Sequence, residues 1–223
     1  RMTLPEYFAY FNDPGDVRNG QWLSGKQYWQ DGSPIMVSTT KRGFDQFYTG
    51  SDGGAPFVYH LELSPSFSLR QNVNTFDCGN DEIAWNMGTR NIKFFPDATN
   101  RSNRNQNNDV PIFRYSDIVL MKAEAILRGA TPTQGHTALS LVNSLRASRT
   151  TSTPWTTVNL DSIYAERARE LSWECWRRND MIRFGKFEDS WGLKTDRNVN
   201  KRIFPIPNVA IQTNPKLVQN PGY

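Results

Sequence analysis

Residues 161–185, DSIYAERARELSWECWRRNDMIRFG, lie in the longest part of the chain without an internal glycine or proline. Asp161 can cap a helix by accepting a bond from a first-turn N–H group, and Gly185 can adopt the left-handed conformation that ends one. Apolar residues recur between them, the last three at three- and four-residue spacing: Ile163, Ala168, Leu171 and Cys175. The pattern predicts one long helix with a single buried stripe, in which Cys175 is a small core residue.

Charged residues are equally ordered along this stretch. Glu166, Glu170 and Glu174 recur every four residues and would share one helix face. Such a row could be the paired carboxylates of a glycosidase. Arginines stand within one turn of each acid, and nearby positive charge keeps a carboxylate ionised and unsuited to acid catalysis. These neighbours are Arg169 for Glu166, Arg167 for Glu170, and Arg177 and Arg178 for Glu174.

We therefore interpret the charged row as structural and expect no catalytic residues. The predicted ion network consists of Arg114, Glu166, Arg167, Glu170, Glu174, Arg177, Asp180 and Arg183.

The composition limits the class of protein further. A chain of 223 residues with 13% aromatic content is long and apolar enough to bury a core. A net charge of +4, with no Lys/Arg block longer than two residues, argues against a nucleic-acid binder. Two cysteines and two histidines argue against a disulfide scaffold, and we expect no metal and no cofactor. A bridge between Cys78 and Cys175 stays open, since the sequence does not place their Cα atoms.

The chain divides into two parts by pattern. Residues 1–108 are rich in turn signals, with short strands predicted at 35–40, 57–63 and 91–95 and a short helix at 4–11. Residues 97–109 are polar and Asn-rich, typical of a surface loop. Residues 109–223 are more helical, and we expect both parts to form one compact unit.

Two further helices are predicted ahead of the long one. Ser116 is a candidate N-cap for a helix that Gly129 ends, and Thr133 or Gly135 opens a second helix that pairs with it. The tail, residues 198–223, is punctuated by Pro and Asn and should be extended and irregular. The predicted fold is mainly α, with long irregular loops and a few short strands.

The helical part carries several motifs in a fixed order. They are DVPIFRYSDIVLMKAEA at 109–125, AL at 138–139, VNSLR at 142–146, ERAREL at 166–171, RRNDMIRFGK at 177–186, FPIP at 204–207 and the terminal QNPGY at 219–223. Together they resemble the SusD/RagB family of nutrient-binding outer-membrane lipoproteins, and NIKFFP at 91–96 fits as well. Before these motifs only Asp13, Asp16 and Arg18 are similar to the family's D-x-R region.

The resemblance implies an α-helical fold with tetratricopeptide-like helix pairs. It also implies a cell-surface protein, held at the outer membrane by an N-terminal lipid, that captures oligosaccharides or peptides for a SusC-like TonB-dependent transporter. The family's lipoprotein leader and most of its N-terminal helical repeats have no counterpart here, so we expect the chain to be the C-terminal part of such a protein.

Sugar binding uses flat aromatic faces together with polar groups that bond hydroxyls. The loop-rich part offers aromatic residues among polar neighbours, and a loop near the long helix offers another. The candidate ligand-binding residues are Trp22, Tyr28, Trp29, Phe44, Tyr48 and Trp155, with Trp191 a further loop tryptophan. Each could equally fill the core of a domain that has few aliphatic residues.

Three functions are consistent with these predictions. The first is oligosaccharide binding for uptake through the partner transporter. The alternatives are a peptide-binding member of the family, and a scaffold that docks on the transporter while the ligand site lies in the missing N-terminal half. A glycoside hydrolase is poorly supported.

Overall fold

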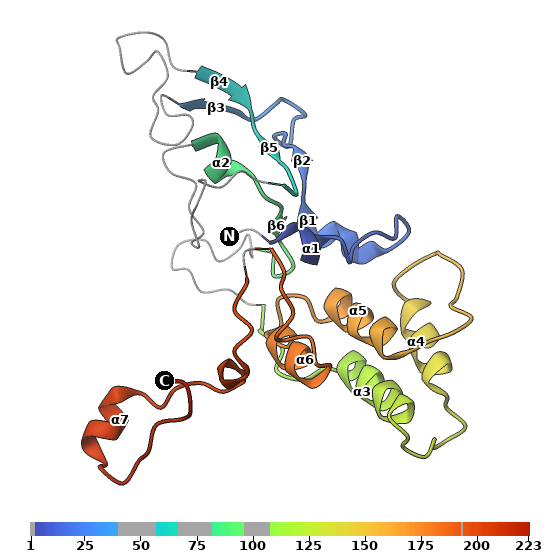
Figure 1. Ribbon diagram of the computed structural model, residues 1–223. Coiled ribbons are helices and arrows are strands. Elements are labelled where there is room, and N and C mark those ends of the chain that lie inside the picture. The colour runs from blue at the N-terminus through green and yellow to red at the C-terminus, as the bar shows by residue number, and fades with distance from the viewer. Residues whose placement is uncertain (1–2, 40–56, 67–81, 96–107, 193) are drawn as a thin grey trace.

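The structure is a computed structural model that describes residues 3–39, 57–66, 82–95, 108–192 and 194–223. Its largest elements are helical, and they lie together in the lower right of Figure 1: α3 (Tyr115–Leu127), α4 (Ala138–Arg146), α5 (Leu160–Glu170) and α6 (Arg177–Arg183). The predicted class, mainly helical with short strands, is confirmed.

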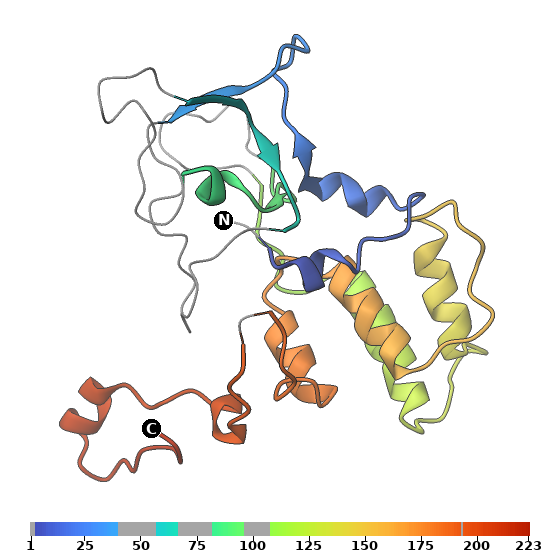
Figure 2. The same ribbon diagram turned by 45° about the horizontal axis from the view of Figure 1, so that its top comes forward.

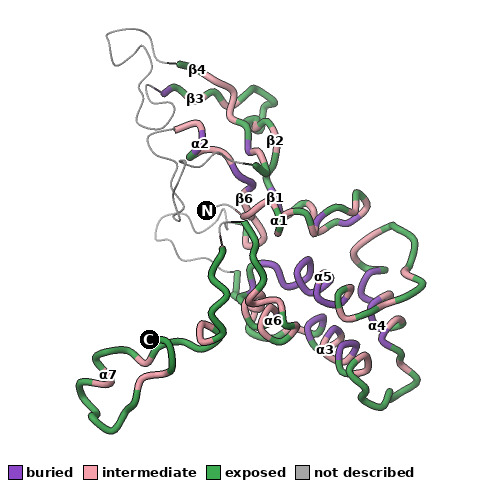
Figure 3. The backbone as a smooth tube through the Cα atoms, viewed as in Figure 1, coloured by how far each residue is buried: buried purple, intermediate pink, exposed green. Residues whose placement is uncertain are grey.

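The core lies between three of these helices. α3 packs against both α4 and α5, and buried residues are concentrated on them in Figure 3. Leu120 of α3, Val142 of α4 and Ile163 of α5 are fully buried in one cluster with Ala123, Ala138, Leu141 and Leu145. The predicted pairing of the first two helices is therefore confirmed, and α5 covers the third side of the same core.

The helix boundaries differ from the predicted ones because side chains elsewhere do the capping. α4 begins after Thr137, whose hydroxyl accepts the Ser140 N–H bond, and α5 begins after Asn159, whose side chain accepts the Ser162 N–H bond. Thr133, Gly135 and Asp161 were thus wrong as helix starts. Ser116 is a buried residue inside α3 rather than its cap.

The predicted long helix is two helices. It stops after Glu170, and Trp173 and Cys175 have φ values of 61° and 65°, in the left-handed region that ends a regular helix. α6 then begins at Arg177 and ends before Gly185, whose φ is 69° as predicted. Cys175 is exposed in the break, so its prediction as a core residue was wrong.

The first part of the chain forms short paired strands. β1 (Trp22–Leu23) pairs with β6 (Arg90–Asn91), β2 (Gly25–Lys26) with β5 (Glu62–Leu63), and β3 (Met36–Thr39) with β4 (Phe57–His60), all antiparallel. These strands extend away from the helices in Figures 1 and 2. α1 (Pro5–Phe8), η1 (Val17–Gln21) and α2 (Glu82–Asn86) connect or flank them.

The tail reaches away from the helical bundle in both views (Figures 1 and 2), but its first part contacts α6, where Arg178 donates to the carbonyls of Lys201 and Arg202. It contains η3 (Val199–Arg202) and one helix that the sequence did not predict, α7 (Asn208–Thr213). Pro207 precedes α7, and its fixed φ suits the start of a helix.

The core predicts a clear stability contrast within α3. Leu120→Ala should lower the free energy of unfolding by about 2–5 kcal/mol, because it leaves a cavity among fully buried side chains. Ile118→Ala, in the same helix but half exposed, should change it little. Urea denaturation of both variants checks this, and equal effects would contradict the assigned core.

Candidate functional site

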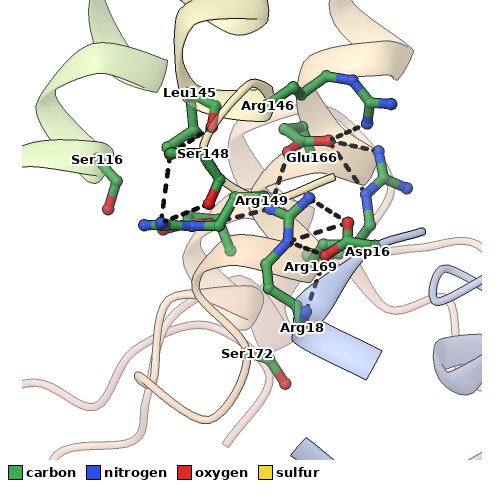
Figure 4. Close-up of polar contacts among 12 residues, drawn as sticks. Asp16, Arg18, Ser116, Leu145, Arg146, Ser148, Arg149, Glu166, Arg169 and Ser172 are labelled. Atoms are coloured by element: carbon green, nitrogen blue, oxygen red, sulfur yellow. Dashed lines mark hydrogen bonds and ion pairs between the residues drawn. The ribbon is translucent and has the colours of Figure 1, made fainter. Parts of the chain in front are cut away.

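The glutamate row lies at the junction of several segments. Glu166 and Glu170 belong to α5, Glu174 follows it, and all three are buried. Each carboxylate is held by cations that come from elsewhere in the chain, as the close-up in Figure 4 shows for Glu166. The row therefore binds segments that are distant in sequence.

Glu166 accepts contacts from three arginines. Arg169 Nη2 lies 2.6 Å and Arg146 Nη1 3.3 Å from its Oε2 atom, and Arg18 Nη1 lies 2.8 Å from its Oε1 atom. Arg18 is itself paired with Asp16 at 2.6 Å. The weak D-x-R match near the N-terminus thus belongs to the same network as the helical motifs.

Glu170 also accepts contacts from three arginines. Arg18 Nη1, Arg149 Nη2 and Arg114 Nη1 lie 2.9, 3.0 and 2.5 Å from its carboxylate oxygens. Burial opposes ionisation, but the hydrogen bonds from Arg149 and Arg114 outweigh it and hold the pKa of Glu170 well below its usual range. A carboxylate in this state does not donate a proton near neutral pH, so Glu170 is unsuited to general acid catalysis.

Glu174 and the end of α5 share their partners. Arg114 Nε lies 2.8 Å from Glu174 Oε2, and Lys93 pairs with the same carboxylate. Lys93 Nζ also donates to the carbonyls of Glu170 and Ser172, each at 3.0 Å. These carbonyls lie where the helix ends, so the two cations cap the break between α5 and α6 as well as pairing with the acid.

A second cluster is centred on Arg167 of α5. Arg167 Nη1 lies 2.7 Å from Asp117 of α3 and its Nε lies 2.9 Å from Asp180 of α6. All three side chains are almost completely buried. Arg183 Nη2 lies 2.8 Å from Asp180 Oδ1 and 2.9 Å from Glu124 Oε2, so it links α6 to α3. This cluster ties three helices together.

Most predicted network members are thus in ion pairs, but several predicted partners were wrong. Arg167 pairs with Asp117 and Asp180, not with Glu170. Glu174 is held by Lys93 and Arg114 rather than by Arg177 and Arg178. Sequence spacing missed these partners because they come from other segments.

Arg177 was wrongly included in the ion network. Its guanidinium carbon lies 3.7 Å from the centre of the Tyr164 ring and 4.9 Å from that of Tyr10. Its nitrogens donate to the Tyr164 carbonyl and the Tyr10 hydroxyl. Within the described ranges it makes cation–π contacts and no ion pair.

The predicted ligand residues have different environments. Trp22 is 7% exposed and lies edge-on to Phe8 and Phe11, with ring centres 6.0 and 5.1 Å away, so its ring has no free face for a sugar. Trp155 packs against the helical core, and the Arg146 guanidinium lies 4.3 Å above its ring. Both rings therefore pack against other groups of the protein. Phe44, Tyr48, Cys78 and most of the Asn-rich segment lie outside the described residues.

Tyr28 and Trp29 are the most exposed candidate aromatics within the described residues. They are 55% and 62% exposed at the start of a tight turn, in which Trp29 N–H donates to the Ser33 carbonyl at 2.8 Å. Asp31 accepts bonds from the Ser33 N–H and hydroxyl, and these bonds hold its pKa below the usual range. Gly32 takes the φ of 83° that the turn requires.

The adjoining strand pair extends this surface. Met36 faces His60 and Ser38 faces Val58 across β3 and β4, so these residues share one face of the sheet. Met36 and Val58 are 51% and 54% exposed, and the Tyr28 ring lies edge-on to His60 at 4.9 Å. We call Tyr28, Trp29, Met36, Val58 and His60 the hairpin surface. It combines aromatic and apolar area with nearby polar groups.

The buried network predicts a large effect of one neutralising change. Glu170→Gln should lower the free energy of unfolding by about 3–5 kcal/mol, because it leaves three arginines without their shared counter-charge. Glu188→Gln, which disrupts an exposed pair with Arg202, is the matched control and should have little effect. Chemical denaturation compares the two, and an unchanged Glu170→Gln variant would contradict the structural role.

The depressed pKa of Glu170 also predicts an acid dependence of stability. The pKa of Glu170 in the folded protein lies below the ordinary value of 4.5. The ionised carboxylate therefore makes its full contribution to the free energy of unfolding above pH 4.5, and this contribution is lost as the pH falls from 4.5 toward the folded pKa. The free energy of unfolding should therefore fall with acidification below about pH 5, and less steeply in Glu170→Gln. Urea titrations from pH 7 to pH 3 measure the two slopes, which would be the same if Glu170 kept its ordinary pKa.

No helix within the described ranges combines the length and apolar character required to span a membrane.

Several known proteins are similar to part of this chain. The SusD family model matches residues 69–223. The starch-binding protein SusD of Bacteroides thetaiotaomicron is 34% identical over 126 residues, which are 52% of this chain and 22% of SusD. The SusD-like protein P25 of Formosa agariphila is 32% identical over 158 residues, 62% of this chain and 28% of P25. The alignments thus span less than a third of either relative.

A laminarin-binding SusD-like protein of known structure aligns with 99% of this chain and 54% of its own, at 19% identity and a TM-score of 0.40. That likeness is too distant to carry an argument. The family model, in contrast, covers well over half of the sequence and contains the motifs that first suggested the relationship. The chain therefore belongs to the SusD family.

Proposed function

We propose that this chain is part of a cell-surface protein that binds oligosaccharides for uptake and passes them to a SusC-like TonB-dependent transporter in the outer membrane. The protein would be held at the membrane by an N-terminal lipid. Family membership supports this proposal, as does the similarity to a protein named for starch binding. On this proposal the chain binds a glycan without cleaving it.

The observation that carries the glycan assignment is the hairpin surface. Its two aromatic residues are more than half exposed although each has a large apolar ring. Their turn is held by internal hydrogen bonds, so little conformational entropy would be lost on binding. Exposed Gln30 and Asp31 can bond sugar hydroxyls beside the rings.

The charged clusters support binding rather than catalysis. The glutamates that could have formed a glycosidase pair are buried and held by arginines, and they lie in the helical part rather than on the hairpin surface. Their carboxylates are occupied by ion pairs within the fold.

The test is affinity electrophoresis on native gels that contain starch, laminarin or another polysaccharide. Trp29→Ala and Tyr28→Ala should each weaken retardation by about two- to tenfold, the usual effect of removing one stacked ring. Trp173→Ala removes a tryptophan that is 41% exposed in the helical part and is the matched control.

Three results would redirect the assignment. Retardation that both hairpin variants retain would place the ligand elsewhere. Binding of peptides in place of glycans would indicate a peptide-binding member of the family. Binding by the longer protein but not by this chain would indicate a scaffold that docks on the transporter.

A further inference from the structure

A pocket lies between α1, α5 and α6, away from the hairpin surface. It has a volume of about 660 Å³ and includes residues from the irregular segment after α6. Ligand pockets usually have volumes of roughly 300–1,000 Å³. We call it the tyrosine pocket, because Tyr7, Tyr10 and Tyr164 line it together with Trp191.

The aromatic wall is rigid and uncharged. Tyr7 lies edge-on to Tyr10 and Tyr10 lies edge-on to Tyr164, with ring centres 5.9 and 6.3 Å apart. Tyr7 is anchored by a 2.8 Å bond from its hydroxyl to the Ala168 carbonyl. Burial raises the pKa of Tyr164 to about 12 although Arg177 opposes this, so the phenol stays neutral and can donate a hydrogen bond.

Charged groups of both signs line the same pocket. Arg177 lies against the tyrosine rings without an ion pair among the described residues. Lys186 pairs with Asp161 at 3.2 Å, and Glu6 accepts a bond from the Gly192 N–H group at 2.9 Å. The Asp189 carboxylate also lines the pocket and has no ion-pair partner in the described part of the chain.

This mixture of charges disfavours both anionic and cationic ligands. An anion would meet the carboxylates of Glu6, Asp161 and Asp189, and a cation would meet the Arg177 guanidinium, which already covers the Tyr164 face. A neutral ligand with several hydroxyls can accept bonds from Arg177 and donate to Asp189 while its apolar faces lie against Trp191 and the tyrosines.

A peptide is less well matched. Peptides are usually held through their main chain by unpaired backbone groups such as a strand edge. The groups described above are mainly side chains, and among the described residues the pocket is lined by α1, α5, α6 and the segments on either side of α1 and after α6, with no strand in its wall. Sugar hydroxyls need only such side-chain donors and acceptors.

We propose that the tyrosine pocket is a second carbohydrate site, which takes one or two rings of a neutral glycan. It rests on the proposed function, because it assumes that the protein binds glycans. It adds a site with its own specificity: the hairpin surface contacts an extended chain, and the pocket holds a short segment or a chain end.

The experiment is calorimetric titration of the chain with neutral disaccharides, namely maltose, cellobiose and laminaribiose. Asp189→Asn keeps the shape of the side chain but removes its charge, and should weaken binding of the recognised disaccharide about tenfold. Trp191→Ala should weaken it about threefold or more. Trp85→Ala and Trp173→Ala, at tryptophans outside the pocket that are 46% and 41% exposed, are the controls and should leave it unchanged. Circular dichroism verifies that each variant is folded.

Each result has a defined meaning. Disaccharide binding that falls in both pocket variants and persists in both controls supports the site. Binding that is equal in all variants overturns it, as does binding of a dipeptide or an anionic sugar in place of the neutral ones. If disaccharides do not bind but polysaccharides do, in a manner that depends on Trp29, the pocket proposal fails and the proposed function stands. If the chain binds no glycan of either kind, both fail.

Discussion

The three buried carboxylates at the end of α5 are the constraint on which the rest of the structure depends. Glu166, Glu170 and Glu174 cannot be buried as ions unless cations reach them, because an uncompensated charge in the interior is strongly unfavourable. The cations come from η1, the segment after β6, the start of α3 and the end of α4: Arg18, Lys93, Arg114, Arg146 and Arg149. Satisfying one short row of acids therefore positions four distant parts of the chain.

The break after α5 belongs to the same arrangement. Two residues with left-handed φ values interrupt the helix, and its terminal carbonyls are bonded by Lys93, a residue that also neutralises Glu174. Turning the chain here lets α6 bring Asp180 to Arg167 and lets Arg177 lie against Tyr164. The glutamates thus hold the segments near β1 and β6 and the ends of α3 and α4, and Arg167 holds α3 and α6.

The candidate binding surfaces lie outside this frame. The hairpin surface is on the paired strands, and the tyrosine pocket is at the edge of α5 and α6, where Arg177 is held by aromatic rings instead of a carboxylate. On the proposed function, this ionic frame would hold the aromatic groups at its margins in place for the ligand.

The sequence by itself determined the helical class, the paired helices, the stop at Gly185 and the family, because periodicity, glycine and motif order are local properties. It also indicated that the acidic row meets arginines, as all three glutamates do. Only the tertiary structure decided which cation meets which acid, because Asp117 and Arg167, or Arg18 and Glu170, are far apart in sequence. The same reason explains Trp22 and Trp29. Both are aromatic residues in a polar stretch, but contacts with Phe8 and Phe11 bury the first, and the turn leaves the second exposed.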